Sequence, residues 1–98
     1  MLCHVVLISF RKDTPKSLRQ DIFDRYQTLR ADCGGSRSGI IFFSVNWNLD
    51  TRKGVDLVEV AVFFDDVALQ AFRIHKKHRE IAEVLSTVAD WQVGDMVI

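Results

Sequence analysis

The chain contains three histidines, and two of them lie close together in the segment FRIHKKHRE, from Phe72 to Glu80. His75 and His78 are three residues apart, so in a continuous helix both would lie on roughly one face. A histidine titrates near neutral pH and can remove a proton from an activated carbon. The third histidine, His4, lies in the apolar segment LCHVVLISF. Whether these side chains do chemistry depends on the elements that position them.

Hydrophobic patterning predicts four strands. The strands are expected at Leu2–Phe10, Ile40–Leu49, Val55–Phe64 and from Trp91 to the end of the chain, because these segments are short, apolar and rich in β-branched residues. A helix is expected after the third strand, capped by Asp65 or Asp66. It falters near His75 and His78, and a further helical stretch follows with apolar residues at helical spacing.

The first helix is expected from about Pro15 to Asp32. Thr14 is of a type that caps helices, and proline is favoured at the first helical position. The following residues recur at helical spacing and predict one buried stripe: Leu18, Ile22, Tyr26, Leu29 and Cys33. The segment GGSRSG, residues 34–39, is expected to end this helix in a turn.

The order β-α-β-β-α-β predicts a single α+β domain over residues 1–98 with a ferredoxin-like fold, in which two helices cover a four-stranded antiparallel sheet. Helices on one face normally leave the other face polar. In the first and third strands both faces are apolar, as Val58, Val60 and Val62 illustrate. We therefore expect a twofold homodimer that joins two sheets face to face into a dimeric α/β barrel.

Composition narrows the partners. Thirteen basic residues balance thirteen acidic ones, which argues against a general nucleic-acid binder. The sequence shows no signal peptide and no apolar run of about 20 residues, so no membrane association is expected. Cys3 and Cys33 lack a paired spacing and are expected to be reduced thiols, which is typical of a cytoplasmic protein.

The order and spacing of several motifs resemble the stress-responsive dimeric α/β-barrel (Dabb) family over essentially the whole chain. These motifs are HVVLISF, NWNLD leading into GVDLVEVAVFF, ALQAF, the histidine pair of HKKH and the closing VGDMVI. The resemblance implies a homodimeric ferredoxin-like barrel. The chain departs from the family pattern where Lys76 replaces a common proline, Asn46 a common glycine and Phe72 an aromatic hydroxyl.

The resemblance also suggests a role for one histidine. A plant cyclase of this family uses a histidine matching His78 as general base, partnered by a tyrosine at the position of Phe72. Phenylalanine cannot donate a hydrogen bond to a developing enolate. Tyr26 is a candidate to supply the missing hydroxyl, and His4 is a candidate to assist.

A cavity between sheet and helices is expected to hold a small apolar ligand, with His4 and His78 as its polar points. The candidate ligand-binding residues are Phe23, Phe72, His75, Leu85 and Trp91. The bland alternatives are that the aromatic residues fill the core, that His4 is hydrogen-bonded within the structure, and that His75 packs at a helix end, where an imidazolium suits the dipole. No metal site and no cofactor are expected, because no acidic or thiol partner stands at a recognisable spacing from the histidines.

Three functions follow in order. The first is a homodimeric stress-responsive α/β-barrel protein that is non-catalytic or binds a small apolar ligand. The second is a cofactor-independent lyase or polyketide cyclase with His78 as general base, which requires an open pocket beside His78. The third, an oxygenase without flavin or haem, rests on analogy of fold alone.

Overall fold

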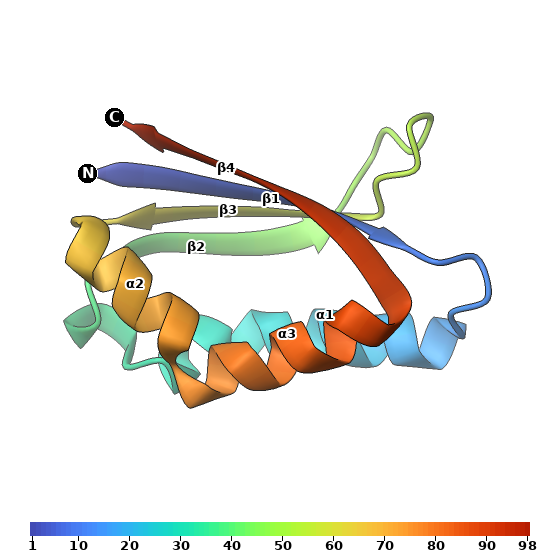
Figure 1. Ribbon diagram of the computed structural model, residues 1–98, viewed down its shortest axis with the longest axis horizontal. Helices are drawn as coiled ribbons and strands as arrows, with labels where there is room; N and C mark the ends of the chain where they lie inside the picture. The colour runs from blue at the N-terminus through green and yellow to red at the C-terminus, as the bar shows by residue number, and fades with distance from the viewer.

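The computed structural model describes residues 1–98. The elements follow the order β-α-β-β-α-α-β with one short 3₁₀ turn. Their bounds are β1 Leu2–Phe10, α1 Lys16–Asp32, η1 Gly35–Arg37, β2 Ile40–Trp47, β3 Leu57–Phe63, α2 Asp66–Ile74, α3 Lys76–Val88 and β4 Ala89–Val97. All three α-helices lie on one side of the sheet, and the two termini lie beside each other at one end (Figure 1).

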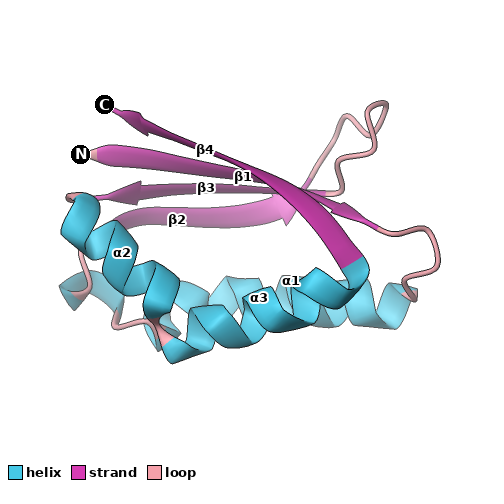
Figure 2. Cartoon of the chain, in the orientation of Figure 1, coloured by secondary structure: helices cyan, strands magenta, loops and turns pink.

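The sheet is antiparallel throughout, with the strand order β2-β3-β1-β4. This is the expected ferredoxin-like arrangement, in which β1 and β3 occupy the centre and the two other strands form the edges (Figure 2). One register shift between Ile40 and Phe42 places Phe42 opposite Val62. The central strands bring His4 and Glu59 onto the same face, the face that the helices cover.

Helix α1 buries the predicted stripe. Ile22, Tyr26 and Leu29 are buried, and Cys33 follows at the helix end. The expectation that Thr14 caps this helix is wrong. The helix begins after Pro15 without a side-chain cap, and the Thr14 hydroxyl instead donates to the Val88 carbonyl at 3.1 Å. Thr14 therefore ties the start of α1 to the end of α3, which satisfies a terminal carbonyl of that helix.

The second helical region is divided at His75, where the expected faltering occurs. His75 has an extended backbone, and its Nδ1 accepts a hydrogen bond from the Lys77 backbone N–H at 3.1 Å. This side chain caps the start of α3, and an accepting nitrogen carries no proton. The expected role as an imidazolium at a helix C-terminus is therefore wrong. Asp65 caps α2 as expected, since its side chain accepts from Ala68 N.

The two faces of the sheet differ in what covers them. The helix-covered face carries the core, with Ile8, Leu57 and Phe63 fully buried. The opposite face carries apolar side chains on every strand: Val5, Leu7, Phe42, Val58, Val60, Val62 and Met96. Within one chain most of these are only partly buried, and Phe42 and Met96 are more than half exposed. The expectation of two apolar faces in the central strands is confirmed for all but one inward position, Glu59.

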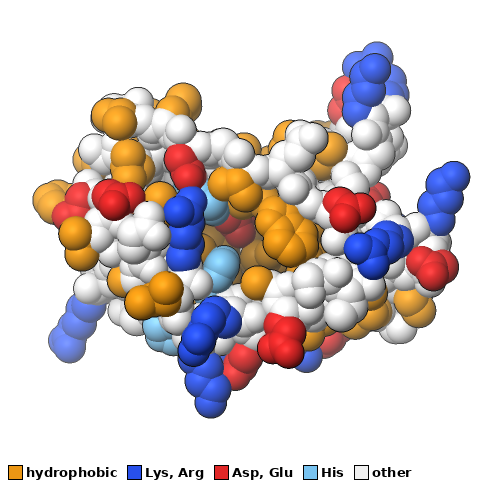
Figure 3. Space-filling view, in the orientation of Figure 1, with side chains coloured by type: hydrophobic (Ala, Val, Ile, Leu, Met, Phe, Trp, Pro, Cys, Tyr) orange, Lys and Arg blue, Asp and Glu red, His pale blue; other side chains and the backbone are white.

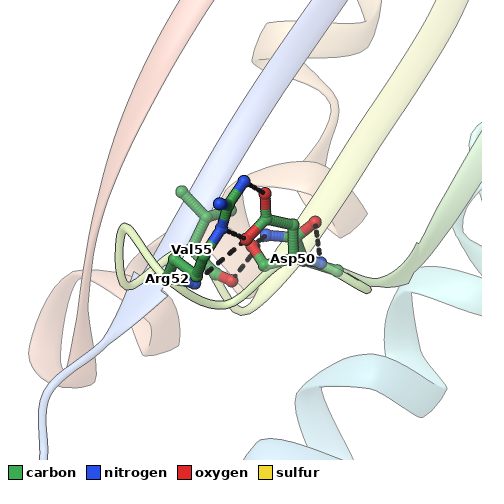
Figure 4. A network of polar contacts seen from close by, with 4 residues as sticks. Asp50, Arg52 and Val55 are labelled. Carbon is green, nitrogen blue, oxygen red and sulfur yellow. Dashed lines mark hydrogen bonds and ion pairs between the residues drawn. The ribbon is translucent and has the colours of Figure 1, made fainter.

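The loop between β2 and β3 projects from the body of the molecule and is closed by local polar contacts (Figure 4). The Asp50 carboxylate accepts two hydrogen bonds from the Arg52 guanidinium, at 2.9 and 2.8 Å, and one from the Arg52 backbone N–H. The Arg52 side chain lowers the pKa of Asp50. These groups are fully solvated, so the contacts shape the loop but define no site.

None of the helices has the length and apolar character needed to cross a lipid bilayer.

Candidate functional site

A pocket of about 200 Å³ lies between the helix-covered face of the sheet and helices α1 and α3. It is lined by His4, Val6, Tyr26, Glu59, Arg73, His78, Ala82, Leu85, Trp91 and Val93. Figure 3 shows the hollow in the middle of one face of the molecule, with histidine and acidic side chains inside it and hydrophobic side chains around it. The pocket thus combines apolar walls with a few polar groups, as small-molecule sites usually do.

The most buried polar group of the pocket is an ionic cluster centred on His4. The Nδ1 atom of His4 lies 2.5 Å from Asp95 Oδ1, and its Nε2 atom lies 3.1 Å from Glu59 Oε2. His4 is 4% exposed and Glu59 2% exposed. Burial alone would lower the pKa of His4, but the two adjacent carboxylates outweigh burial and raise it above its ordinary value. His4 is therefore suited to remain protonated at neutral pH.

The His4–Glu59 contact is an ion pair without hydrogen-bond geometry. Its atoms are close enough for charge attraction, yet Glu59 Oε2 has no hydrogen-bond donor. The two carboxylates approach opposite nitrogens of the His4 ring, so the cluster does not converge on one point. Nowhere does the chain bring together three histidine, cysteine or acidic side chains that can hold a metal ion.

His78 lies at the start of α3, and its ring is held in one orientation. Its Nδ1 lies 3.1 Å from the Arg73 carbonyl oxygen. A carbonyl only accepts, so Nδ1 carries the hydrogen and Nε2 is left with the free lone pair. Burial lowers the pKa of His78, an effect that the hydrogen bond to Arg73 only partly offsets. His78 is thus suited to be neutral at pH 7, with one nitrogen able to accept a proton.

Tyr26 comes from α1 and is 5% exposed. Burial, aided by the negative charge of Glu59, raises the pKa of its hydroxyl far above the ordinary value. The hydroxyl therefore stays protonated across the physiological range and is able to donate a hydrogen bond into the pocket that it lines.

Arg73 joins the two histidines of the pocket. Its guanidinium donates to Asp95 Oδ2 at 2.7 Å, while Asp95 Oδ1 contacts His4. The backbone carbonyl of the same residue orients His78. Because α2 ends at Ile74 and the chain turns at His75, this one residue bridges the end of α2, the edge strand β4 and the start of α3.

The structure brings together five of the residues expected from the sequence: His4, Tyr26, His78, Leu85 and Trp91 line one pocket. Phe72 does not line it but lies directly behind, with its ring centre 4.5 Å from that of His78. Phe23 lies elsewhere and stacks on Trp47 at 5.1 Å. His75 lies in a separate small depression beside Cys33 and Ala68.

Sequence reasoning missed Glu59, Arg73 and Asp95. Glu59 carried a usable signal, since it is the one charged residue within the apolar segment LVEVAVF and falls on the same face as Leu57 and Ala61. An acidic residue at such a position must find a partner or a function. Arg73 and Asp95 carried no comparable local signal, because their pairing joins distant parts of the chain.

The family model of the stress responsive A/B barrel domain, Dabb, matches residues 2–98. The chain belongs to this family, as the motifs suggested. No curated protein sequence matches the chain significantly.

Solved structures agree on the fold. A dimeric ferredoxin-like protein of unknown function from Thermobifida fusca is similar with a TM-score of 0.84 and 14% identity, over 99% of this chain and 90% of that one. The hydroxynitrile lyase from Passiflora edulis is similar with a TM-score of 0.82 and 14% identity, over 99% and 92%. SnoaB, a cofactor-independent oxygenase from Streptomyces nogalater, is similar with a TM-score of 0.74 and 15% identity, over 99% and 91%. Both enzymes and proteins without known activity thus share this fold.

Proposed function

We propose that the protein binds a small, largely apolar molecule in the pocket and removes a proton from it with His78, in a cofactor-independent reaction of the lyase or cyclase type. The observation that carries this proposal is a half-buried His78 with a lowered pKa, an oriented ring and a free Nε2 beside an open pocket. A filled core would have favoured a purely structural role for these residues.

The chemistry follows from the positions of the groups. His78 Nε2 accepts a proton from a carbon next to a carbonyl, and the electrons of the broken C–H bond move onto the carbonyl oxygen. The Tyr26 hydroxyl is available to donate a hydrogen bond to that oxygen. This replaces the hydroxyl that Phe72 lacks. His4 has both ring nitrogens occupied, so it acts by holding the carboxylates rather than by touching the ligand.

The second candidate is a binding protein without catalysis. Phe72 favours it, because phenylalanine stands where the cyclase resemblance implies a tyrosine, and its ring packs against His78 and Phe63. In this reading the pocket holds a ligand, and His78 supplies a hydrogen-bond acceptor only.

A substrate-independent assay separates the two. Phenylacetone is a single-ring carbon acid, and its exchange of hydrogen for deuterium beside the carbonyl can be followed by NMR in heavy water. General bases contribute roughly 100-fold or more to such steps. We expect the wild type to accelerate exchange, His78→Gln to lose about 100-fold, and the surface change Glu83→Gln to have no effect. Equal rates for the wild type and His78→Gln would refute the catalytic role.

We also propose that two copies join through the uncovered face of the sheet. Leaving its apolar side chains wet forgoes roughly 1.5 kcal/mol for each large one. A twofold arrangement covers both sheets at once. The description of the Thermobifida fusca neighbour as dimeric supports this assembly.

A reducing compartment such as the cytoplasm suits the two cysteines. Cys3 and Cys33 are both buried and unpaired, and reduced thiols persist where disulfides do not form. Labelling of the protein in intact cells with a thiol reagent, followed by unfolding, would reveal two free thiols if this placement holds.

A further inference from the structure

We propose that Glu59 is a ligand-recognition residue whose free carboxylate oxygen accepts a hydrogen bond from a hydroxyl group of a neutral, single-ring molecule bound in the pocket. This inference rests on the proposed function, since it concerns a ligand of the same pocket, but it assigns a role to a residue that proton abstraction by His78 does not require.

The first step is the unpaired acceptor. Glu59 is 2% exposed, and its Oε2 atom has no hydrogen-bond donor. His4 Nε2 lies 3.1 Å away but outside hydrogen-bond alignment. Buried polar atoms in folded proteins are nearly always hydrogen-bonded, and those left without a partner require an explanation. Glu59 lines the pocket, so a molecule within it is in a position to provide the missing donor.

The second step is the charge of the ligand. Two carboxylates, Glu59 and Asp95, are balanced by Arg73 and by a His4 whose pKa is raised. The cluster is therefore close to neutral as a whole. An anion would meet the Glu59 carboxylate, and a cation would meet the His4 imidazolium and Arg73. A hydroxyl group donates to Glu59 without bringing a buried charge that nothing compensates.

The third step is size and shape. A water molecule occupies about 30 Å³ of liquid, so a pocket of about 200 Å³ holds the volume of roughly half a dozen waters. The walls formed by Val6, Leu85 and Trp91 are apolar. One ring with a small polar substituent fits these limits. A neutral cyclic alcohol or a phenol is therefore the ligand class that the pocket best accommodates.

The test compares phenol with fluorobenzene, which has nearly the same shape but cannot donate a hydrogen bond. Binding is followed by NMR through the ring signals of His78 and Tyr26. Sites built to bond a hydroxyl strongly reject analogues that lack it. We expect phenol to bind the wild type at least about tenfold more tightly. Glu59→Leu should abolish this preference, and Glu59→Gln, which keeps an acceptor oxygen, should retain part of it. The matched surface variant Glu83→Gln should behave as wild type.

The outcomes separate this inference from the proposed function. Equal affinities of the wild type for phenol and fluorobenzene would overturn the role of Glu59 while leaving a ligand pocket beside His78. A preference for phenol that persists in a folded Glu59→Leu variant would also overturn it. If neither probe shifts the pocket signals, both this inference and the proposed function fail. The comparison of the two probes on wild-type protein decides the matter even if Glu59→Leu does not fold.

Discussion

The two faces of the sheet contrast in the position of their polar residues. On the uncovered face the centre is apolar, with Val5 and Val60 paired across β1 and β3. On the helix-covered face an apolar core surrounds a polar centre, where His4 contacts the carboxylates of Glu59 and Asp95. An apolar centre asks only to be covered, whereas a buried ionic centre must be paired and hydrogen-bonded. The first face is therefore suited to assembly and the second to recognition.

The largest effect is expected on the uncovered face. Val60→Asp would place a carboxylate at the centre of the proposed dimer interface, at a cost of roughly 3 kcal/mol or more per buried charge. That lowers the dimer affinity by over about a hundredfold. Analytical ultracentrifugation should show monomers, while Val67→Asp, on an exposed position of α2, should leave the oligomeric state unchanged. A folded Val60→Asp protein that still dimerises as wild type would remove the contrast.

A smaller effect is expected on the covered face. His4→Leu leaves the buried carboxylate of Glu59 without its cation, which should lower the free energy of unfolding by about 3–5 kcal/mol. The double variant His4→Leu/Glu59→Leu removes the uncompensated charge and should recover much of that loss. Urea denaturation measures both. If the double variant lost at least the sum of the two single losses, the ion pair would not be the interaction that makes this centre stable.

The smallest effect is a pH dependence of opposite sign at the two histidines. The pKa of His4 is raised above 6.5. Its stabilising contribution is complete below pH 6.5 and is lost as the pH rises through the folded-state pKa. The difference in unfolding free energy between wild type and His4→Leu should therefore shrink from about pH 6 to about pH 9. A difference that grows over this range would contradict the raised pKa.

For His78 the sign is reversed. Its pKa is lowered from 6.5, so its neutral form is favoured by folding. The corresponding stability is present above pH 6.5 and is lost as the pH falls through the lowered pKa. Unfolding of wild type and His78→Gln at a series of acidic pH values gives this second difference, which should decrease toward acid.

Much of the fold was predictable from local patterns. Strand β1 was predicted with its observed bounds, and the stripe of α1 through Ile22 and Leu29 followed from helical spacing. These features depend on residues close in sequence, which is why periodicity finds them. The break at His75 was also expected, although its capping role was not. A cap depends on the backbone angles of one residue, and composition does not fix those.

The site was predictable only in part, for a physical reason. His4, Tyr26 and His78 attract notice by their chemistry, and the fold brings them together. Glu59 reaches His4 only through the register of β3 on β1, and Asp95 only through that of β4 on β1. Phe23 shares its helix with Tyr26 but turns toward Trp47, because a one-residue step rotates a helical side chain by about 100°.

The protonation states of His4 and His78 test the central claim most directly, namely that a neutral, oriented base stands beside a charged recognition cluster in one pocket. An NMR titration of the histidine rings should place the pKa of His78 below 6.5 and that of His4 above it. The neutral His78 ring should carry its hydrogen on Nδ1. A His78 that titrates above 6.5, or whose neutral ring carries the hydrogen on Nε2, would contradict the claim.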